Sequence, residues 1–230
     1  MNKSNCLIPL LVAAVLLGSG CRVTVTLGAP VEFTPKELPA HESICLDIID
    51  KERRYEEGKG LGFYFDPSEF FEATLNTELR SYFRVNTGTD CAVDDTIVSA
   101  SLQNLHFQGM GGSAGPFPVS EAESYATIEL NMIAPDHSRR KVTATSATYT
   151  IHELASSRIV MIVVARAAIR DAAKKSVQQL ACSKGLTECS NQKDEQQTIK
   201  GAIAEYNKIK MAGEPKVEYS IFGYSFSSWF

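Results

Sequence analysis

Three stretches of the chain between residues 95 and 154 alternate between polar and apolar side chains, and this period of two constrains the fold more than any other feature. They have the sequences DTIVSASLQNLHF, ESYATIELNMIA and KVTATSATYTIHEL. Successive side chains of a strand point to opposite faces, so the alternation predicts three strands with one buried and one wet face. Residues 108–121 and 135–140 connect them, which predicts that neighbouring strands pair antiparallel as a meander.

Helical patterns lie on both sides of these strands. Residues 65–83 carry Asp66 as a cap, Pro67 in the first helical position and Glu69 as in a capping box. The apolar stripe of this first helix consists of Phe71, Leu75, Leu79 and Tyr82. Residues 158–181 have a second helical spacing, and residues 43–49 predict a buried strand before the first helix. We therefore expect an α+β fold with the order strand, helix, three-stranded antiparallel meander, helix, and with the helices on one face of the sheet.

The N-terminal segment has the features of an export signal. Lys3 precedes an apolar run over residues 6–17, and three small residues lead to Cys21. The run is shorter than the roughly 20 apolar residues that a membrane-spanning helix needs. A charged start, a short apolar middle and small residues before a cleavage point predict a signal peptide over residues 1–20.

The residues around the cleavage point, LLGSGC, resemble the lipobox of bacterial lipoproteins. The family favours Leu three residues before the cysteine, whereas Gly18 holds that place here. The resemblance implies that Cys21 carries diacylglycerol and palmitate and anchors the chain to a membrane. Arg22 after the cysteine resembles the sorting signal for the periplasmic face of the outer membrane. The alternative is an ordinary signal peptide, with Cys21 incidental.

Four further cysteines remain in the exported chain, and an even number in an oxidising compartment predicts two disulfides. Four cysteines allow three pairings, of which the sequence spacing favours Cys182 with Cys189 and Cys45 with Cys91. A zinc site is the alternative, but it is disfavoured because the chain has no C-x-x-C pair.

The ends of the exported chain have their own character. Residues 21–42 contain three prolines and predict a tether to the folded part, residues 43–181. Residues 182–230 contain a predicted polar helix over 193–213 and a last segment, VEYSIFGYSFSSWF. That segment is either a strand of the protein's own sheet, an exposed edge that docks a partner or membrane, or a segment without fixed structure. Its aromatic residues are the candidate partner-binding residues: Tyr219, Phe222, Tyr224, Phe226, Trp229 and Phe230.

Nothing in the sequence predicts catalysis, a cofactor or a metal. A formal G-x-S-x-G pattern spans Gly111–Gly115, but prolines follow it and exclude the helix that would support a nucleophilic Ser113. The four histidines, His41, His106, His137 and His152, are isolated and lack the spacing of metal ligands. The net charge of −4 does not suggest a nucleic-acid partner.

Beyond the lipobox, the pattern over residues 43–181 resembles small bacterial envelope lipoproteins of the YajG kind. More loosely, it resembles the auxiliary lipoproteins of lipid and lipopolysaccharide transport. The segments that carry the resemblance are FFEATLNTELRSYF, TIVSASLQNLHF, YATIELNMIA, KVTATSATYTI and ARAAIRDAAKKSVQQLA. The resemblance implies a non-catalytic binding or assembly partner in the cell envelope, which contacts an envelope protein. The alternatives are a lipid-binding transport component and a peptidoglycan-synthase activator, which would need a longer tether.

Overall fold

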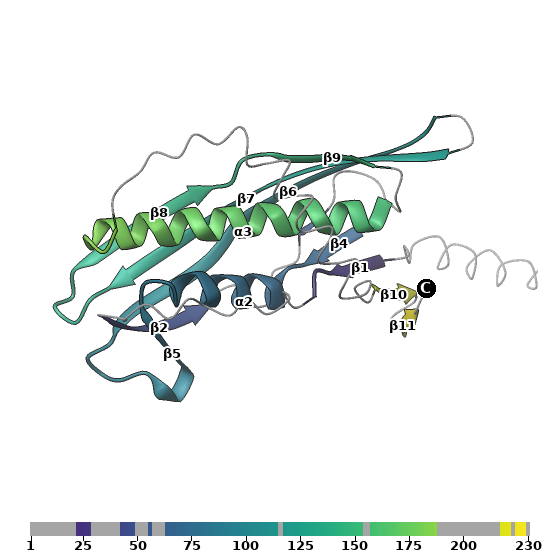
Figure 1. Ribbon diagram of the computed structural model, residues 1–230. Coiled ribbons are helices and arrows are strands. Elements are labelled where there is room, and N and C mark those ends of the chain that lie inside the picture. Colours follow the sequence, from purple (N-terminus) through teal and green to yellow (C-terminus); the bar gives the residue numbers. More distant parts are fainter. Residues whose placement is uncertain are drawn as a thin grey trace, which may run out of the picture.

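A computed structural model describes residues 22–28, 42–48, 55–56, 63–114, 117–153, 157–187, 217–221 and 224–228. The fold is α+β, as predicted, with a six-stranded sheet and a smaller five-stranded sheet beside two helices (Figure 1). The elements are β1 (Arg22–Thr26), β2 (Ser43–Ile48), β3 (Tyr55–Glu56), β4 (Phe63–Asp66), α2 (Ser68–Leu79), β5 (Arg84–Thr87), the short 3-10 helix η2 (Gly88–Asp90), β6 (Thr96–Ala114), β7 (Phe117–Ile133), β8 (Arg139–Thr145), β9 (Tyr149–Glu153), α3 (Ser157–Ser183), β10 (Val217–Ile221) and β11 (Tyr224–Ser228).

The larger sheet has the order β5-β2-β6-β7-β8, with β9 also paired to β7. Its centre is the predicted antiparallel meander of β6, β7 and β8. The predicted first strand joins this meander in parallel, because β2 pairs parallel with both β5 and β6. The helix α2 returns the chain to the end of the sheet at which β2 starts, so the next strands, β5 and β6, run parallel to β2. Because the meander is antiparallel, the sheet as a whole is mixed.

The β6–β7 hairpin is much longer than the sequence predicted. Backbone pairing continues without a break from Asn104 and Thr127 to Ala114 and Phe117. The prediction that residues 108–121 form a connecting loop is wrong, because most of this segment extends the two strands. Ser113 accordingly lies in β6, opposite Pro118, rather than at a turn from strand to helix.

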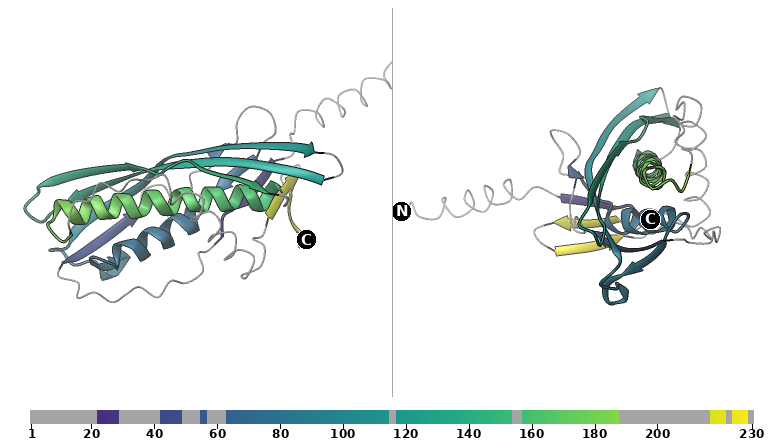
Figure 2. Two further views of the ribbon diagram at one scale, coloured as in Figure 1. Left: turned by 45° about the horizontal axis from the view of Figure 1, so that its top comes forward. Right: turned by 90° about the vertical axis from the view of Figure 1, so that its left-hand side faces the viewer.

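Two irregularities occur at the same level on both sides of β7. In β6, the register shifts between Leu102 and Asn104, so that Gln103 is an extra residue. On the other side, the third predicted strand is broken into β8 and β9, and three residues, 146–148, lie opposite two residues of β7. Because bulges bend and twist a strand, these two features account for the curvature of the sheet around α3 in Figure 2.

Both helices lie on the same side of the larger sheet (Figure 2). The N-cap of α2 is Pro67, one residue later than predicted, and it makes no side-chain cap hydrogen bond. The carboxylate of Asp66, directly before it, accepts hydrogen bonds from the Ser68 backbone N–H at 3.1 Å and from the Ser68 hydroxyl at 2.7 Å. The predicted stripe of α2 is buried at Phe71, Leu75 and Leu79. The 27-residue helix α3 is buried on all sides from Met161 to Ile169, because the sheet covers one side and α2 lies against the other.

The smaller sheet was not predicted. It has the order β11-β10-β1-β4-β3, in which β1 is parallel to β4 and antiparallel to β10. Residues 22–28 therefore belong to the fold, and the predicted tether over 21–42 is contradicted for these residues. Residues 29–41 and the predicted helix over 193–213 lie outside the described residues. Tyr55 and Glu56, within the charged segment at 50–60, form β3.

Neither described helix combines the length and the apolar character needed to cross a membrane.

Candidate functional site

The backbone of Leu27 joins the N-terminal strand to both helices. Its N–H donates a hydrogen bond of 3.1 Å to the carbonyl of Asp66, the last residue of β4, two residues before α2 begins. Its carbonyl accepts hydrogen bonds from Nε of Arg166, at 2.7 Å, and from Nη2 of the same side chain. The Leu27 side chain is fully buried in the core. We call Leu27, Asp66 and Arg166 the anchor junction, because it fixes the chain six residues after Cys21.

Arg166 is a cation placed inside an apolar helix segment. Only 4% of the residue is exposed, and its neighbours in α3 are aliphatic. Its guanidinium carbon lies 4.9 Å from the centre of the Phe70 ring in α2, and that of Arg170 lies 5.7 Å from the same ring. A guanidinium over an aromatic face is attracted to the π electrons, and more strongly where water is excluded. The guanidinium therefore binds β1 to α2 and α3 at one point.

The chain turns directly after the junction. Gly28 has a φ of 68°, a left-handed conformation that costs a residue with a Cβ about 1–2 kcal/mol. The strand before it, β1, begins at Arg22, the residue after Cys21. Cys21 itself lies outside the described residues.

Cysteine pairing agrees with the sequence where it is described. Cys45 in β2 and Cys91 after η2 form a disulfide with a Cα–Cα distance of 5.2 Å. Cys182 at the end of α3 is also disulfide-bonded, and its partner lies outside the described residues. Cys189, the expected partner, is one of the residues not described.

The aromatic tail forms a hairpin on the protein's own smaller sheet, the first of the three structures considered for it. Tyr219 lies in β10 opposite Val23 of β1 and opposite Phe226 of β11. Tyr224 begins β11. The other three candidate partner-binding residues, Phe222, Trp229 and Phe230, lie outside the described residues. Of the candidate residues, Tyr219 therefore lies beside β1, the strand that follows Cys21.

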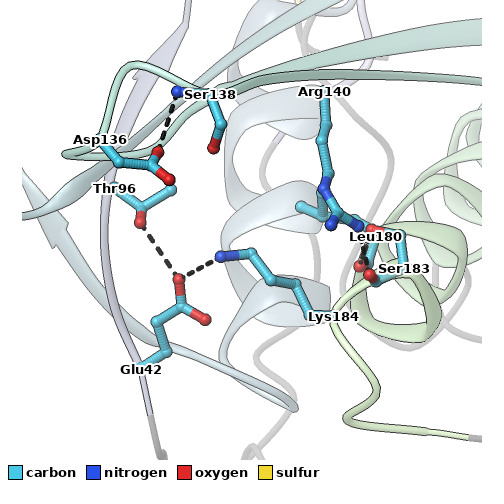
Figure 3. A network of polar contacts seen from close by, with 8 residues as sticks. All are labelled: Glu42, Thr96, Asp136, Ser138, Arg140, Leu180, Ser183 and Lys184. Atoms are coloured by element: carbon cyan, nitrogen blue, oxygen red, sulfur yellow. Dashed lines mark hydrogen bonds and ion pairs between the residues drawn. The ribbon is translucent and has the colours of Figure 1, made fainter.

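A second polar cluster holds the opposite end of α3. Oε1 of Glu42 accepts hydrogen bonds from Nζ of Lys184, at 2.6 Å, and from Oγ1 of Thr96, at 3.1 Å (Figure 3). The Glu42 carbonyl accepts a hydrogen bond of 3.0 Å from the backbone N–H of Arg84. Arg140 donates to the carbonyl of Ser183 in the last turn of α3. These contacts hold the first residues of β2, β5 and β6 beside the C-terminal end of α3.

Hydrogen bonds, burial and neighbouring charges shift the pKa values of Asp95 and Glu78. A hydrogen bond from the Asn86 side chain, and then one from the Ala92 backbone N–H at 2.8 Å, lower the pKa of Asp95. Asp95 therefore closes the turn that leads into β6, since its own backbone N–H donates to the carbonyl of Ala92 at 3.1 Å. In α2, burial raises the pKa of Glu78, and the positive charges of Lys174 and Arg170 oppose that rise.

Within the described residues, no group of three or more His, Cys, Asp or Glu side chains lies close enough together to hold a metal ion. His106 is stacked on Tyr125, with ring centres 4.8 Å apart. His137 occupies a turn with a φ of 64°, and His152 lies in β9. His41 lies outside the described residues.

Comparisons with known proteins find similarity in structure but not in sequence. No protein-family profile and no curated protein sequence matches the chain. Rare lipoprotein B from Shewanella oneidensis is 13% identical with a TM-score of 0.39, and the match covers 63% of this chain and 97% of that one. A minor lipoprotein from Acinetobacter baumannii is 13% identical with a TM-score of 0.41, covering 63% and 94%. A protein described as a homologue of neuraminyllactose-binding hemagglutinin, from Helicobacter pylori, is 11% identical with a TM-score of 0.36, covering 81% and 98%.

Sequence reasoning missed Arg166 as a structural residue. Arg166 lies inside the apolar run IVMIVVARAAI, residues 159–169. An isolated arginine within an otherwise apolar helix indicates a hydrogen-bond acceptor in the core, because a buried guanidinium needs acceptors. The sequence does not show that the acceptor is a backbone carbonyl 139 residues away.

Proposed function

We propose that this protein is a lipid-anchored bacterial envelope lipoprotein that acts as a non-catalytic binding or assembly partner. Residues 1–20 are the signal peptide, and Cys21 carries diacylglycerol and palmitate that anchor it at the periplasmic face of the outer membrane. The observation that carries the proposal is the lipobox-like LLGSGC followed directly by β1, a strand built into the fold.

The position of β1 supports an anchor at this place. A lipid anchor fixes the position of the folded domain only if the chain between them is rigid. A strand paired on both sides is more rigid than a loose tether. Val23 to Val25 pair with β10 on one side and with β4 on the other. Arg166 then holds the backbone at Leu27. Two or three acyl chains are needed for stable attachment, since one chain alone binds only marginally.

The same geometry weighs against one alternative. An activator of a peptidoglycan synthase would extend from the outer membrane through a long tether, whereas here the fold begins at Arg22. The domain is therefore held against the membrane. A lipid-binding transport component remains the second candidate, because α3 lies along the face of a curved sheet (Figure 2).

The test is an intact-mass measurement on the protein purified from membranes, beside a Cys21→Ala variant. We expect an N-terminus at Cys21 that carries acyl mass, and an unacylated variant that leaves the membrane fraction. Species that co-purify in stoichiometric amount then identify the class of partner: an envelope protein supports the assembly role, and a lipid supports the transport role. An unacylated N-terminus in the native protein contradicts the proposal.

A further inference from the structure

The larger sheet ends on one side at β8, a strand of seven residues with an open edge (Figure 1). It is hydrogen-bonded to β7 and, within the described residues, to no strand on its other side. Its register with β7 runs from Arg139 to Thr145 without a bulge, and it contains no proline. Such an edge offers unpaired backbone groups to another strand, and natural proteins often protect it with a proline, a bulge or a cover. The strand at the opposite side of the sheet, β5, has only four residues.

Hydrogen bonds at both ends of β8 show which of its backbone groups face outward. The Ala134 N–H donates to the carbonyl of Ser138 at 3.0 Å, and the Ser146 N–H donates to the carbonyl of Ala126 at 2.9 Å. Because every second residue of an antiparallel strand is bonded to its partner, the even-numbered residues of β8 are bonded to β7. The odd-numbered residues direct their N–H and C=O groups to the open edge, and all four are exposed: Arg139, Lys141, Thr143 and Thr145.

We infer that this edge pairs with the same edge of a second copy, so that two larger sheets join across a two-fold axis at Val142. A two-fold axis makes the two strands antiparallel and makes every contact between them reciprocal. With Val142 on the axis, all seven residues of each strand are paired. Arg139 then lies opposite Thr145 of the second copy, and Lys141 lies opposite its Thr143. The inference goes beyond the proposed function and does not depend on a lipid at Cys21.

The positions of the charges favour this register over its neighbours. Both outward-facing cations lie in the first half of β8 and both outward-facing threonines in the second half, so antiparallel pairing sets each cation opposite a hydroxyl. Hydrogen bonding across the edge allows only shifts of two residues. One such shift brings Lys141 opposite Lys141 of the second copy, where like charges repel, and the other leaves Arg139 beyond the paired strands. Lys141 is also compensated within its own chain, because its Nζ lies 2.8 Å from Oε2 of Glu129.

The inner face of the sheet adds an apolar contact at the axis. Val142 packs against the core but remains partly exposed. In the pair it meets Val142 of the second copy at a position without backbone hydrogen bonds between the two strands, where opposite side chains are closest. Burial of this apolar surface adds to the backbone pairing. The axis is perpendicular to the sheet, so both copies can also be anchored at one membrane, with the sheets along its surface.

Proline at position 143 tests the pairing. The Thr143 N–H faces the open edge, so Thr143→Pro removes a donor to the second copy without removing a bond to β7. Thr143→Ala is the matched control, because it keeps the backbone N–H. Each variant is made in the whole chain with Cys21→Ala, its fold is checked by circular dichroism, and its mass in solution is measured by analytical ultracentrifugation over a range of concentrations.

We expect twice the mass of one chain for the Cys21→Ala parent and for Thr143→Ala. Thr143→Pro should raise the dissociation constant about tenfold or more, since the symmetric pair loses one hydrogen bond at each of its two equivalent positions. A parent that is monomeric at all concentrations overturns the inference. Equal dissociation constants for the folded proline and alanine variants overturn it as well.

A cysteine at the axis tests the register by a second route, which holds even where Thr143→Pro unfolds the chain. In this register, two copies of Val142→Cys place their Cα atoms about 4.5 Å apart, within the range of a disulfide. Thr145→Cys is the matched control on the same exposed strand, because its counterpart lies six residues along the paired strand, about 20 Å away. We expect a disulfide-linked dimer of Val142→Cys in non-reducing electrophoresis and a monomer of Thr145→Cys. Cross-linking of Val142→Cys that does not exceed that of Thr145→Cys overturns the inference.

Discussion

The guanidinium of Arg166 donates two hydrogen bonds to the backbone carbonyl of Leu27, although the two residues are 139 positions apart. This contact fixes the chain close to Cys21, because only β1 and Leu27 separate the cysteine from the interior of α3. With the proposed acylation of Cys21, a force on the lipid would reach the core through this strand. The anchor junction therefore has both a stabilising and a positioning role.

Replacing Arg166 with methionine should lower the free energy of unfolding by about 2–4 kcal/mol. The substitution leaves the buried Leu27 carbonyl without the Arg166 donors and removes the contact with Phe70. Urea unfolding of the Cys21→Ala protein, followed by circular dichroism, measures the effect. Arg140→Met is the matched control, because Arg140 also donates to a backbone carbonyl but is exposed. We expect a loss below about 1 kcal/mol there, since water replaces an exposed donor. Equal losses in the two variants would show that burial does not matter at Arg166.

The central part of the fold was predictable because local patterns agree with tertiary packing. Alternation placed Val98, Ala100 and Leu102 on the buried face of β6, and all three are buried. The same alternation placed Asn104 on that face, yet Asn104 is exposed because the bulge at Gln103 reverses the parity of the strand. A bulge adds one residue without a strong sequence signal, so alternation alone does not locate it.

The smaller sheet was not predictable by the same means. Its strands β1, β4 and β10 are four or five residues long and far apart in the sequence. Periodicity gives little information over such lengths, and pairing between distant segments leaves no local pattern. The prolines of residues 21–42 indicated a tether, but the first of them, Pro30, follows the turn at Gly28. The folded part therefore begins before the proline-containing segment.

Removing the Cys45–Cys91 disulfide should cost about 2–4 kcal/mol. The bond closes a segment of 46 residues that contains β4, α2 and β5, and a long closed loop restricts the unfolded chain strongly. The Cys45→Ala/Cys91→Ala variant, compared with the oxidised wild type in urea unfolding, measures this difference. The wild type in reducing agent should approach the stability of the variant in the same agent. A variant as stable as the oxidised wild type would contradict the prediction.

Stability should fall in acid through Asp95. Hydrogen bonds from Asn86 and Ala92 lower the pKa of Asp95 in the folded protein, so its carboxylate contributes stability above its unfolded pKa of about 3.9. That contribution is lost as the pH falls from this value through the lower folded pKa. Asp95→Asn should flatten the decline in melting temperature below about pH 4. Asn86→Ala, which removes one of the two hydrogen bonds, should make that decline less steep. Because the slope with pH is compared, a uniform loss of stability in either variant does not imitate the result. An unchanged slope in Asp95→Asn would assign the acid sensitivity to other carboxylates.

A test of how tightly α3 packs against the sheet distinguishes the assembly role from the lipid-binding role. Ala165, Ala168 and Ala172 are fully buried, and side chains this small let the helix approach the sheet closely. If that interface is filled by protein alone, Ala168→Leu should cost about 1–3 kcal/mol through overpacking. Gln179→Leu is the control in the same helix, because Gln179 is exposed, and it should change stability by less than about 0.5 kcal/mol. Calorimetric melting of both variants measures the two effects. A tolerated Ala168→Leu would instead indicate space between helix and sheet, and if that variant also purified without a lipid that accompanies the wild type, the lipid-binding function would be favoured over the assembly role.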